Sequence, residues 1–516
     1  MPPQRRRREA RGSKSPAIPL SALRSSATAC LLCIVSFASP SLAQSAAAPG
    51  TALATLTEML SDPKRCTPTV IALQGTGDPN VAPLLAAMTR SGDAKRRAYG
   101  VTAAAALLDK AAAPILLERL RGDSDMDIRA DAAARLIALD AIGTEDLAAA
   151  LASPDERVQC LAARALAVKG QLAAARPVLA RLTASKVPST ACLSRTCLLG
   201  LGDRDQLEPI RAAVREAKAS PAVVGLIVRQ VEDQKIAAAM ALVLEVAGNE
   251  DSPLPLRVQA YAAAAKLSSA AAVAIRDAIA DSRSTVFRVQ LLKLLAEADA
   301  GGEHLKAVAT GGDAAAALAR FELARRAGGA QASAAAGAAL ALEHPIAVAY
   351  VLDRAGEDIK ARGAAAEFYV PAFVGYIRSV DPKPAEMQRE HFFAAAAAAR
   401  LLELGTPRAL SALRELLGGK TTAVTRAVAA GLLRARNPAA CELMLPLLSN
   451  AYPELATDAA LALGHFGRRE GRAALADIVA NPQRSPPALV VLASWYVLKI
   501  DGQTKQAAGE LAKLIK

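Results

Sequence analysis

A short phrase of apolar and small residues recurs along the chain at a nearly constant interval. Its clearest copies begin at Ile128 and Val158, and a third begins at Leu455. Weaker copies start near Arg97, Thr190, Val223, Leu256, Val286, His391, Val424 and Ala488. The steps are 30 to 33 residues within each of two blocks, one from Arg97 to Val286 and one from His391 to Ala488. Each copy reads as one helix, and a fixed interval of this length indicates a repeat architecture.

A second helix is predicted before each phrase. Several of these helices are expected to open with proline, whose missing N–H is not needed in the first turn: Pro83, Pro114, Pro177, Pro209 and Pro407. Polar turns such as 122–125 and 153–156 separate the two helices. The predicted unit is therefore a pair of antiparallel helices within each 30 to 33 residues.

The composition favours helices over a sheet. Hydrophobic residues make up 53% of the chain but aromatics only 3%, and runs such as 103–106 and 394–399 show that much of the apolar share is alanine. Alanine suits closely packed helices, and the alternation of β-branched and aromatic residues that a sheet needs is missing. We expect an all-α fold, an α-solenoid of antiparallel helix pairs, with almost no strand.

The repeated phrase resembles the HEAT repeat family, specifically the short phycobilisome-lyase-like variety. The resemblance is carried by an acidic turn, a β-branched residue followed by Arg, and a small-residue helix, as in Asp125, Ile128-Arg129 and Ala462-Leu463-Gly464. The arginine is absent from three copies, which have Gln159, Ala191 and Ala456 in its place. The resemblance covers residues 80–300 and 391–516. It implies a helical-repeat fold and says almost nothing about activity.

The interval fails between Val286 and His391. Two degenerate copies are predicted at 314–326 and 345–355, and the segment after them does not fit the unit. Seven of the fifteen aromatic residues after Ala43 lie in this part of the chain: Tyr350, Phe368, Tyr369, Phe373, Tyr376, Phe392 and Phe393. Large apolar side chains dominate protein interfaces, so Phe368, Tyr369, Phe373 and Tyr376 are the candidate partner-binding residues. The alternative is that these rings plug the misfit between two solenoid segments.

The N-terminus is typical of a secretory signal. A basic stretch precedes an apolar run at 27–38, and Ser41 and Ala43 are small residues at the positions that a signal peptidase reads. The run is shorter than the ~20 residues of a transmembrane helix, and no later segment reads as a span. We expect cleavage near Ala43 and a periplasmic or extracellular protein without a membrane span. A basic disordered tail on a cytosolic protein is the alternative.

Removal of this segment changes the charge. The chain carries +13, of which +6 lies in residues 1–43. The remaining +7 is spread among acidic residues, which indicates a mildly basic surface rather than a nucleic-acid site. The predicted division is a signal peptide at 1–43, a lead-in and cap at 44–80, solenoid blocks at 81–345 and 391–516, the second with a C-terminal cap, and an aromatic-rich insertion at 346–390.

Sequence motifs for catalysis are absent. The chain has no dinucleotide or phosphate loop, no nucleophile elbow and no zinc-protease motif. Glu303-His304, Glu343-His344 and Glu390-His391 have the reverse order of the His-Glu pairs in HEAT-type deoxyhypusine hydroxylases, and their unequal spacing favours no metal site. Five cysteines follow the signal, an odd number that does not indicate a disulfide scaffold. We expect no cofactor.

These observations lead to one functional hypothesis and two alternatives. The first is an exported, non-catalytic HEAT-repeat protein that acts as a scaffold or adaptor for a protein partner. The second is a lyase-like or chaperone-like subunit acting on a protein partner, although a phycobilin lyase works in the cytoplasm, which the export signal contradicts. The third is a cytosolic regulator with a basic N-terminal tail.

Overall fold

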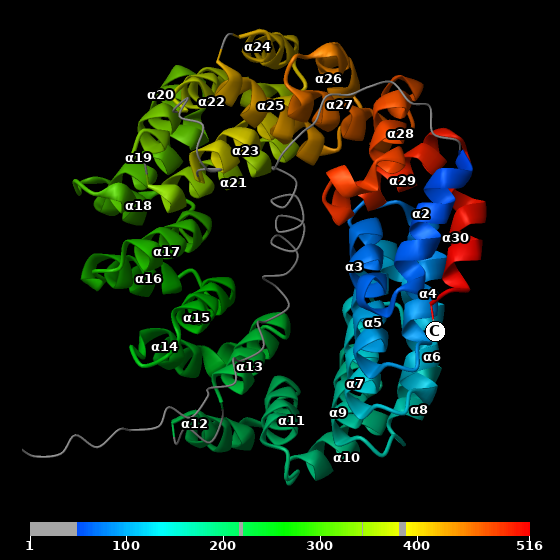
Figure 1. The fold of residues 1–516 in the computed structure, drawn as a ribbon. Coiled ribbons are helices and arrows are strands. Elements are labelled where there is room, and N and C mark those ends of the chain that lie inside the picture. The colour runs from blue at the N-terminus through cyan, green and yellow to red at the C-terminus, as the bar shows by residue number, and fades with distance from the viewer. Residues whose placement is uncertain (1–48, 216–219, 343, 381–388, 420, 516) are drawn as a thin grey trace, which may run out of the picture.

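The computed structural model describes residues 49–215, 220–342, 344–380, 389–419 and 421–515, and every regular element in these ranges is a helix. The α-helices alternate between an inner and an outer layer of one ring (Figure 1). This arrangement confirms the predicted all-α solenoid of antiparallel helix pairs. The predicted signal peptide and its cleavage site at Ala43 lie outside the described residues.

The inner layer consists of the odd-numbered helices. Their bounds are α3 (Pro63–Gln74), α5 (Ala94–Leu108), α7 (Met126–Ala138), α9 (Glu156–Val168), α11 (Pro188–Gly200), α13 (Pro221–Asp233), α15 (Leu254–Leu267), α17 (Thr285–Ala298), α19 (Ala314–Ala327), α21 (Pro345–Arg362), α23 (Arg389–Leu404), α25 (Thr422–Ala435), α27 (Pro453–His465) and α29 (Pro487–Ile500).

The outer layer consists of the even-numbered helices. Their bounds are α2 (Pro49–Ser61), α4 (Ala82–Thr89), α6 (Ala113–Gly122), α8 (Thr144–Ala150), α10 (Leu172–Leu182), α12 (Leu207–Arg215), α14 (Met240–Gly248), α16 (Ala271–Asp281), α18 (Glu303–Ala309), α20 (Gly329–Leu340), α22 (Tyr369–Arg378), α24 (Pro407–Leu417), α26 (Ala440–Met444), α28 (Arg472–Ala480) and α30 (Thr504–Ala512). Short 3₁₀ turns lead into several of them, including η2 (Asp109–Ala112) and η5 (Gly363–Phe368).

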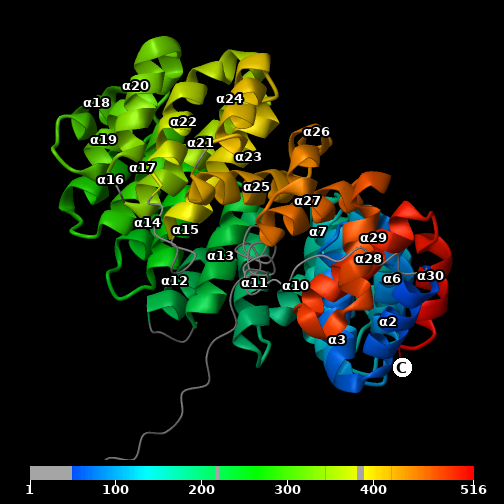
Figure 2. The ribbon, with the colours of Figure 1, turned by 45° about the horizontal axis from the view of Figure 1, so that its top comes forward.

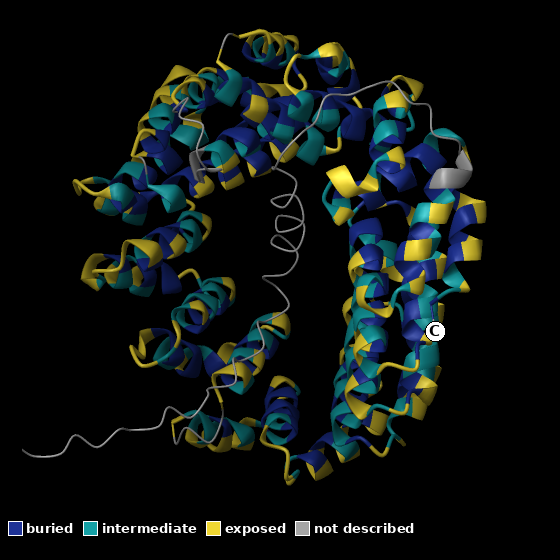
Figure 3. Cartoon of the chain, in the orientation of Figure 1, coloured by how far each residue is buried: buried dark blue, intermediate teal, exposed yellow. Residues whose placement is uncertain are grey.

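The repeated phrase marks the inner layer. Every copy identified in the sequence begins one to three residues inside an odd-numbered helix, from Arg97 in α5 to Ala488 in α29. The two degenerate copies coincide with α19 and with the first half of α21. The small and apolar residues of the phrase are buried between the two layers, as the dark blue band of Figure 3 shows. The periodicity therefore reports the helix face that packs against the outer layer.

Polar residues at the turns begin the inner helices. The Asp125 carboxylate accepts a hydrogen bond from the Asp127 N–H at 2.8 Å, which caps α7. Arg129 then donates to the carbonyl oxygen of Asp123, six residues back, at 2.7 Å. In the next repeat, Gln159 donates in the same way to the carbonyl of Ser153. An amide side chain thus replaces the arginine in a repeat where the HEAT-like pattern has lost it.

One predicted helix start is wrong. Pro177 was expected to open an outer helix, but it lies inside α10, which begins five residues earlier at Leu172. As the sixth residue of α10, this proline lies past the four N–H groups that have no intrahelical partner, so it removes one helical hydrogen bond, to the Ala173 carbonyl.

The two ends of the solenoid pack against each other and close the ring. α2 contacts α28, α29 and α30, α3 packs beside α29, and α4 packs beside α30 (Figures 1 and 2). α3 thereby occupies the inner-layer position that follows α29. The two end segments of the chain meet at one seam, where each covers the apolar face that the other would leave exposed.

Polar contacts at this seam fix its register. The indole N–H of Trp495 donates to Oδ2 of Asp78 at 3.1 Å, and both side chains are buried. Asn80 donates to the Thr504 hydroxyl at 3.2 Å. Arg436, at the end of α25, donates to the carbonyl of Gly75. The loop between α3 and α4 is therefore held by the C-terminal part of the ring at three points.

The segment expected to be an insertion continues the helix stack. η5 and α22 pack on α20 and α23, so α22 is the outer partner of α23. The sequence pattern does not reveal this helix, because its aromatic residues differ from the alanine-rich pattern of the other outer helices.

By length and composition alone, the helical stretch Ala94–Gly122 is apolar enough to cross a membrane, which differs from the expectation that no segment after the signal would qualify. In the structure it is not one straight helix. Asp109 has a positive φ of 51°, and the turn η2 divides the stretch into α5 of the inner layer and α6 of the outer layer. The two helices pack against α4, α7 and each other, as a core pair of the ring does.

Candidate partner-binding site

The four candidate aromatic residues do not form one exposed patch. Tyr369 and Phe373 on α22 are fully buried, with 0% of each side chain exposed, and their rings stack with centroids 5.4 Å apart. Phe368 lies beside Tyr369 at 4.4 Å between centroids and is half-buried. Tyr376, one turn further along α22, is also half-buried. Tyr369 and Phe373 thus fill the layer between α20, α22 and α23.

Phe368 reaches the surface at an open groove of about 680 Å³. The groove lies between the start of α20, the turn η5 and the start of α24, and Pro371 and Arg408 form part of its wall. Glu367 on its floor accepts a hydrogen bond from the Thr406 hydroxyl at 2.7 Å. Partner binding by Phe368 and Tyr376 stays a prediction. Tyr369 and Phe373 are buried beneath this surface and support it through packing.

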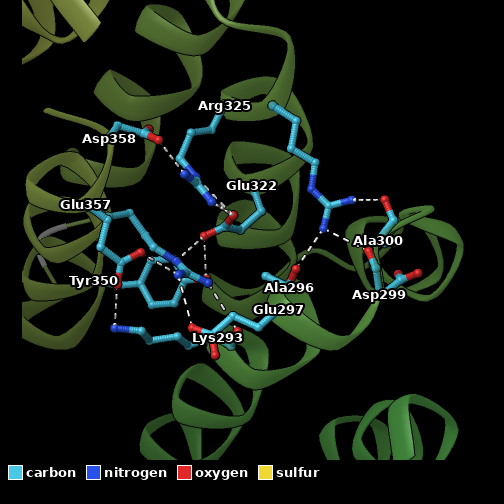
Figure 4. A network of polar contacts seen from close by, with 12 residues as sticks. Lys293, Ala296, Glu297, Asp299, Ala300, Glu322, Arg325, Tyr350, Glu357 and Asp358 are labelled. Atoms are coloured by element: carbon cyan, nitrogen blue, oxygen red, sulfur yellow. Dashed lines mark hydrogen bonds and ion pairs between the residues drawn. The ribbon is translucent and has the colours of Figure 1, made fainter. Parts of the chain in front are cut away.

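A buried ion network joins α17, α19 and α21 (Figure 4), and Tyr369 donates a hydrogen bond to one of its carboxylates. Its centre is Glu322 of α19, whose side chain is fully buried. The Glu322 carboxylate accepts hydrogen bonds from the Tyr350 hydroxyl and from Nε of Arg354, each at 2.7 Å. Arg325 donates to the same carboxylate at 2.8 Å through Nη2. Three donors therefore balance the cost of burying this charge.

A second buried carboxylate links the network to the aromatic helix. Asp358 of α21 accepts from Arg325 and from the Tyr369 hydroxyl, each at 2.7 Å. The pKa of Tyr369 is raised, first because the phenol is buried and then because the Asp358 charge disfavours the phenolate. Tyr369 is thus held as a donor, which ties α22 to α21.

The network also reaches α17, the inner helix two positions before α21. Arg354 of α21 pairs with Glu297 of α17 at 3.2 Å and donates to the Lys293 carbonyl at 3.1 Å. Lys293 in turn pairs with Glu357 at 3.1 Å and with Asp353. Burial alone would raise the pKa of Glu357, but hydrogen bonds from Arg354 and Lys293 outweigh it and hold the pKa below its usual value. α21 is therefore bound by side chains to α17 as well as to α19.

This arrangement is suited to holding helices at the break in the repeat. In a regular solenoid each repeat contacts only its neighbours, whereas α21 contacts α17 two inner positions away. Sequence reasoning found the break but not the network, since charged residues in a helix are usually read as exposed. The spacing of Tyr350, Arg354 and Asp358, four residues apart on one helix face, was the available clue.

The residues considered for metal or redox chemistry lie apart. His304 is in α18, His344 precedes α21, and His391 is in the first turn of α23. Within the described ranges, no group of three or more His, Cys, Asp or Glu is arranged to hold a metal ion. The five described cysteines are free and buried: Cys66, Cys160, Cys192, Cys197 and Cys441. Burial raises the pKa of each of these thiols.

The layers differ in charge, which sequence reasoning missed. The odd-numbered helices, α3 to α29, contain 26 Arg and Lys against 14 Asp and Glu, a net charge of +12. The even-numbered helices, α2 to α30, contain 13 of each. The segments that connect the helices carry an excess of negative charge. Summed along the chain the basicity looks diffuse, and it becomes visible only when the helices are assigned to layers.

No protein-family model matches this chain, and no curated protein matches it. Among solved structures, the chain is similar to Kap95p in its complex with RanGDP, with 13% identity, 76% of this chain and 56% of that chain covered, and a TM-score of 0.35. It is similar to Kap121p, with 12% identity, coverages of 89% and 56%, and a TM-score of 0.35, and to Kap121p bound to Nup53p, with 14% identity, coverages of 91% and 53%, and a TM-score of 0.31. The chain spans about half the length of these proteins. At such scores the likeness carries no argument about function, and the helical-repeat fold is established by the helices themselves.

Proposed function

We propose that this protein is an exported, non-catalytic scaffold of HEAT-like repeats that holds a protein partner against the inner layer of its ring. The observation that carries the proposal is the continuity of that layer. One helix from every repeat contributes to it, and α3 beside α29 removes the break that two free ends would leave. A repeat protein of this kind binds through an extended surface rather than through a single pocket.

The proposal has two parts that can be tested separately. Export predicts that the mature chain begins at Gln44 and is recovered outside the cytoplasm. Sequencing of the N-terminus in fractionated cells checks this. Retention of residues 1–43 on a cytosolic protein would contradict export and favour a cytosolic regulator with a basic tail.

Binding to the inner layer can be tested by placing a photo-crosslinking amino acid at single positions. Leu226 on α13 of the inner layer and Arg414 on α24 of the outer layer are suitable positions, because both side chains are exposed. We expect crosslinks to a discrete protein partner from position 226 and few or none from position 414. Equal crosslinking at both positions, or crosslinking at 414 alone, would contradict the proposal.

A further inference from the structure

The inner layer holds positive charges that its own acids do not pair. Arg229 of α13 and Arg426 of α25 donate no hydrogen bond and form no ion pair within the described part of the chain. The nearest acids, Asp233 and Asp458, act on them only at longer range. Arg164 of α9 is similar, since its Nε is buried without a hydrogen-bond partner among the described residues. These cations lie on α9, α13 and α25, and Arg164 and Arg229 are close enough to act on the same carboxylate, Asp233.

The side chains of Arg229 and Arg426 lie on the faces of their helices that turn away from the outer layer. In α13, Val224, Ile227 and Val228 are buried and form the face toward the core. Arg229 follows Val228 by one residue, which turns its side chain about 100° from that face. Arg426 is exposed on α25. A ligand at the inner surface would meet both guanidinium groups.

We propose that the inner layer binds an extended acidic segment of a protein partner. This inference rests on the proposed function and adds the charge of the partner to it. The net charge of +12 on the inner helices, against zero on the outer helices, selects a negatively charged ligand for this surface. The separation of Arg229 on α13 from Arg426 on α25, which lie on different parts of the ring (Figure 1), favours a segment that follows the curve of the layer over a compact anion.

A protein segment fits this surface better than a nucleic acid does. The same helices carry 14 acidic residues, which would repel a backbone with one charge at every phosphate. Single-stranded nucleic acids also need exposed aromatic rings on which bases stack. Tyr261, Phe287 and Phe321 of the inner helices are buried, and the exposed ring of Phe392 on α23 is already covered on one face by the Arg434 guanidinium, 4.5 Å from the ring centre. An acidic polypeptide needs fewer cations and no stacking surface.

The test measures the binding of the purified protein to three labelled probes by fluorescence anisotropy. The probes are a peptide of alternating Glu and Ser, its Gln and Ser counterpart, and single-stranded DNA of the same charge as the acidic peptide. We expect binding of the acidic peptide, weaker binding as salt is raised because the charges are screened, and no binding of the neutral peptide.

Two double variants with equal changes in net charge localise the site. Arg229→Glu with Arg426→Glu alters the inner layer, and Arg414→Glu with Lys505→Glu alters the outer layer. The inner variant should bind the acidic peptide about tenfold more weakly, a loss of roughly 1.4 kcal/mol, and the outer variant should bind nearly as well as the unchanged protein. Thermal unfolding followed by circular dichroism checks that both variants are folded.

Three outcomes would overturn the inference. Equal weakening in both variants would indicate non-specific attraction to a basic protein. Tighter binding of DNA, lost in the inner variant, would indicate a nucleic-acid surface. No binding of the acidic peptide, with crosslinks from position 226 still present, would refute the acidic partner but leave the proposed function standing, whereas absence of those crosslinks as well would refute both.

Discussion

At the scale of single residues, the structure depends on a few buried polar side chains in a core that consists mostly of alanine and leucine. Glu322 and Asp358 are buried carboxylates with two or more donors each, and Asp78 accepts the single tryptophan of the chain. Burying a charged side chain costs free energy unless all of its hydrogen-bond and ion-pair partners are present. Loss of one partner should therefore cost more than loss of an exposed ion pair.

The substitution Glu322→Gln tests this expectation. It removes the buried carboxylate that Arg325 and Arg354 share, although Asp358 still pairs with Arg325 and Glu357 with Arg354, and breaking a buried pair costs about 3–5 kcal/mol. We expect a drop of that size in the free energy of unfolding, measured in urea. Glu303→Gln is the matched control, because Glu303 pairs with Lys306 at an exposed site on α18 and should contribute less than about 1 kcal/mol. Similar losses in the two variants would contradict the structural role of the network.

His465 beside the seam predicts a dependence of stability on pH. Burial, with the nearby positive charges of Lys499 and Arg436, lowers its pKa to about 4, while Asp78 acts in the opposite direction. Its ring lies 3.4 Å from the Tyr496 hydroxyl, measured at Nδ1. Since the unfolded chain binds this proton more readily, His465 should reduce stability as the pH falls from about 6.5 to about 4. His465→Gln should lose less stability over that range in urea unfolding, and an unchanged pH profile would contradict the assignment.

At the scale of helices, close packing is set by small residues. α23 and α25 share the most extensive contact in the ring. Gly431 of α25 faces the backbone of α23, and a Cβ atom there would collide with the Ala395 carbonyl. The pair can approach so closely only because this position carries no side chain.

The substitution Gly431→Ala should therefore destabilise the protein, by about 1–3 kcal/mol for an overpacked contact. Gly337→Ala in α20 is the control, because a Cβ there meets nothing within 4 Å. That substitution should stabilise α20 by about 0.5–1 kcal/mol, since alanine favours a helix. The melting temperature of each variant is compared with that of the unchanged protein. A shift of the same sign in both variants would contradict this account of the α23–α25 contact.

Two substitutions in α22 distinguish its two suggested roles, packing in the core and docking of a partner. Phe373→Ala removes a fully buried ring and should cost about 3–5 kcal/mol of stability. Tyr376→Ala removes a half-buried ring and should cost much less. If this helix also docks a partner, Tyr376→Ala should weaken capture of that partner while the protein remains stable. Unchanged capture by Tyr376→Ala would leave α22 as packing alone.

The periodic part of these helices could be predicted from the sequence, and the irregular part could not. The phrase at Ile128 and Val158 repeats because each inner helix buries the same face, so its copies marked α5 to α17 and α23 to α29 correctly. The ion network has no repeat, because Glu322 and Arg354 meet only where α21 departs from the regular stack. The aromatic residues Tyr369 and Phe373 were singled out by composition, but their burial depends on α20 and α23 and is not encoded locally.

At the scale of the whole molecule, the account depends on the closure of the ring. The contacts that close it join residues between 361 and 424 positions apart, such as Trp495 with Asp78, and no repeat pattern predicts such a pair. Closure makes the inner layer continuous, places its excess positive charge around one interior, and covers the apolar ends of the stack. An open solenoid would have none of these properties.

A crosslink across the seam tests closure most directly. Asn80 and Thr504 are joined by a hydrogen bond of 3.2 Å, so cysteines at these two positions should be linked within one chain by a short bismaleimide. A pair at Asn80 and Ser333, which lie on different parts of the ring, is the control. We predict efficient intramolecular linkage of positions 80 and 504 in the monomer, read by peptide mass spectrometry, and none for the control pair. Absence of the 80–504 link, or its formation only between two chains, would contradict a closed ring.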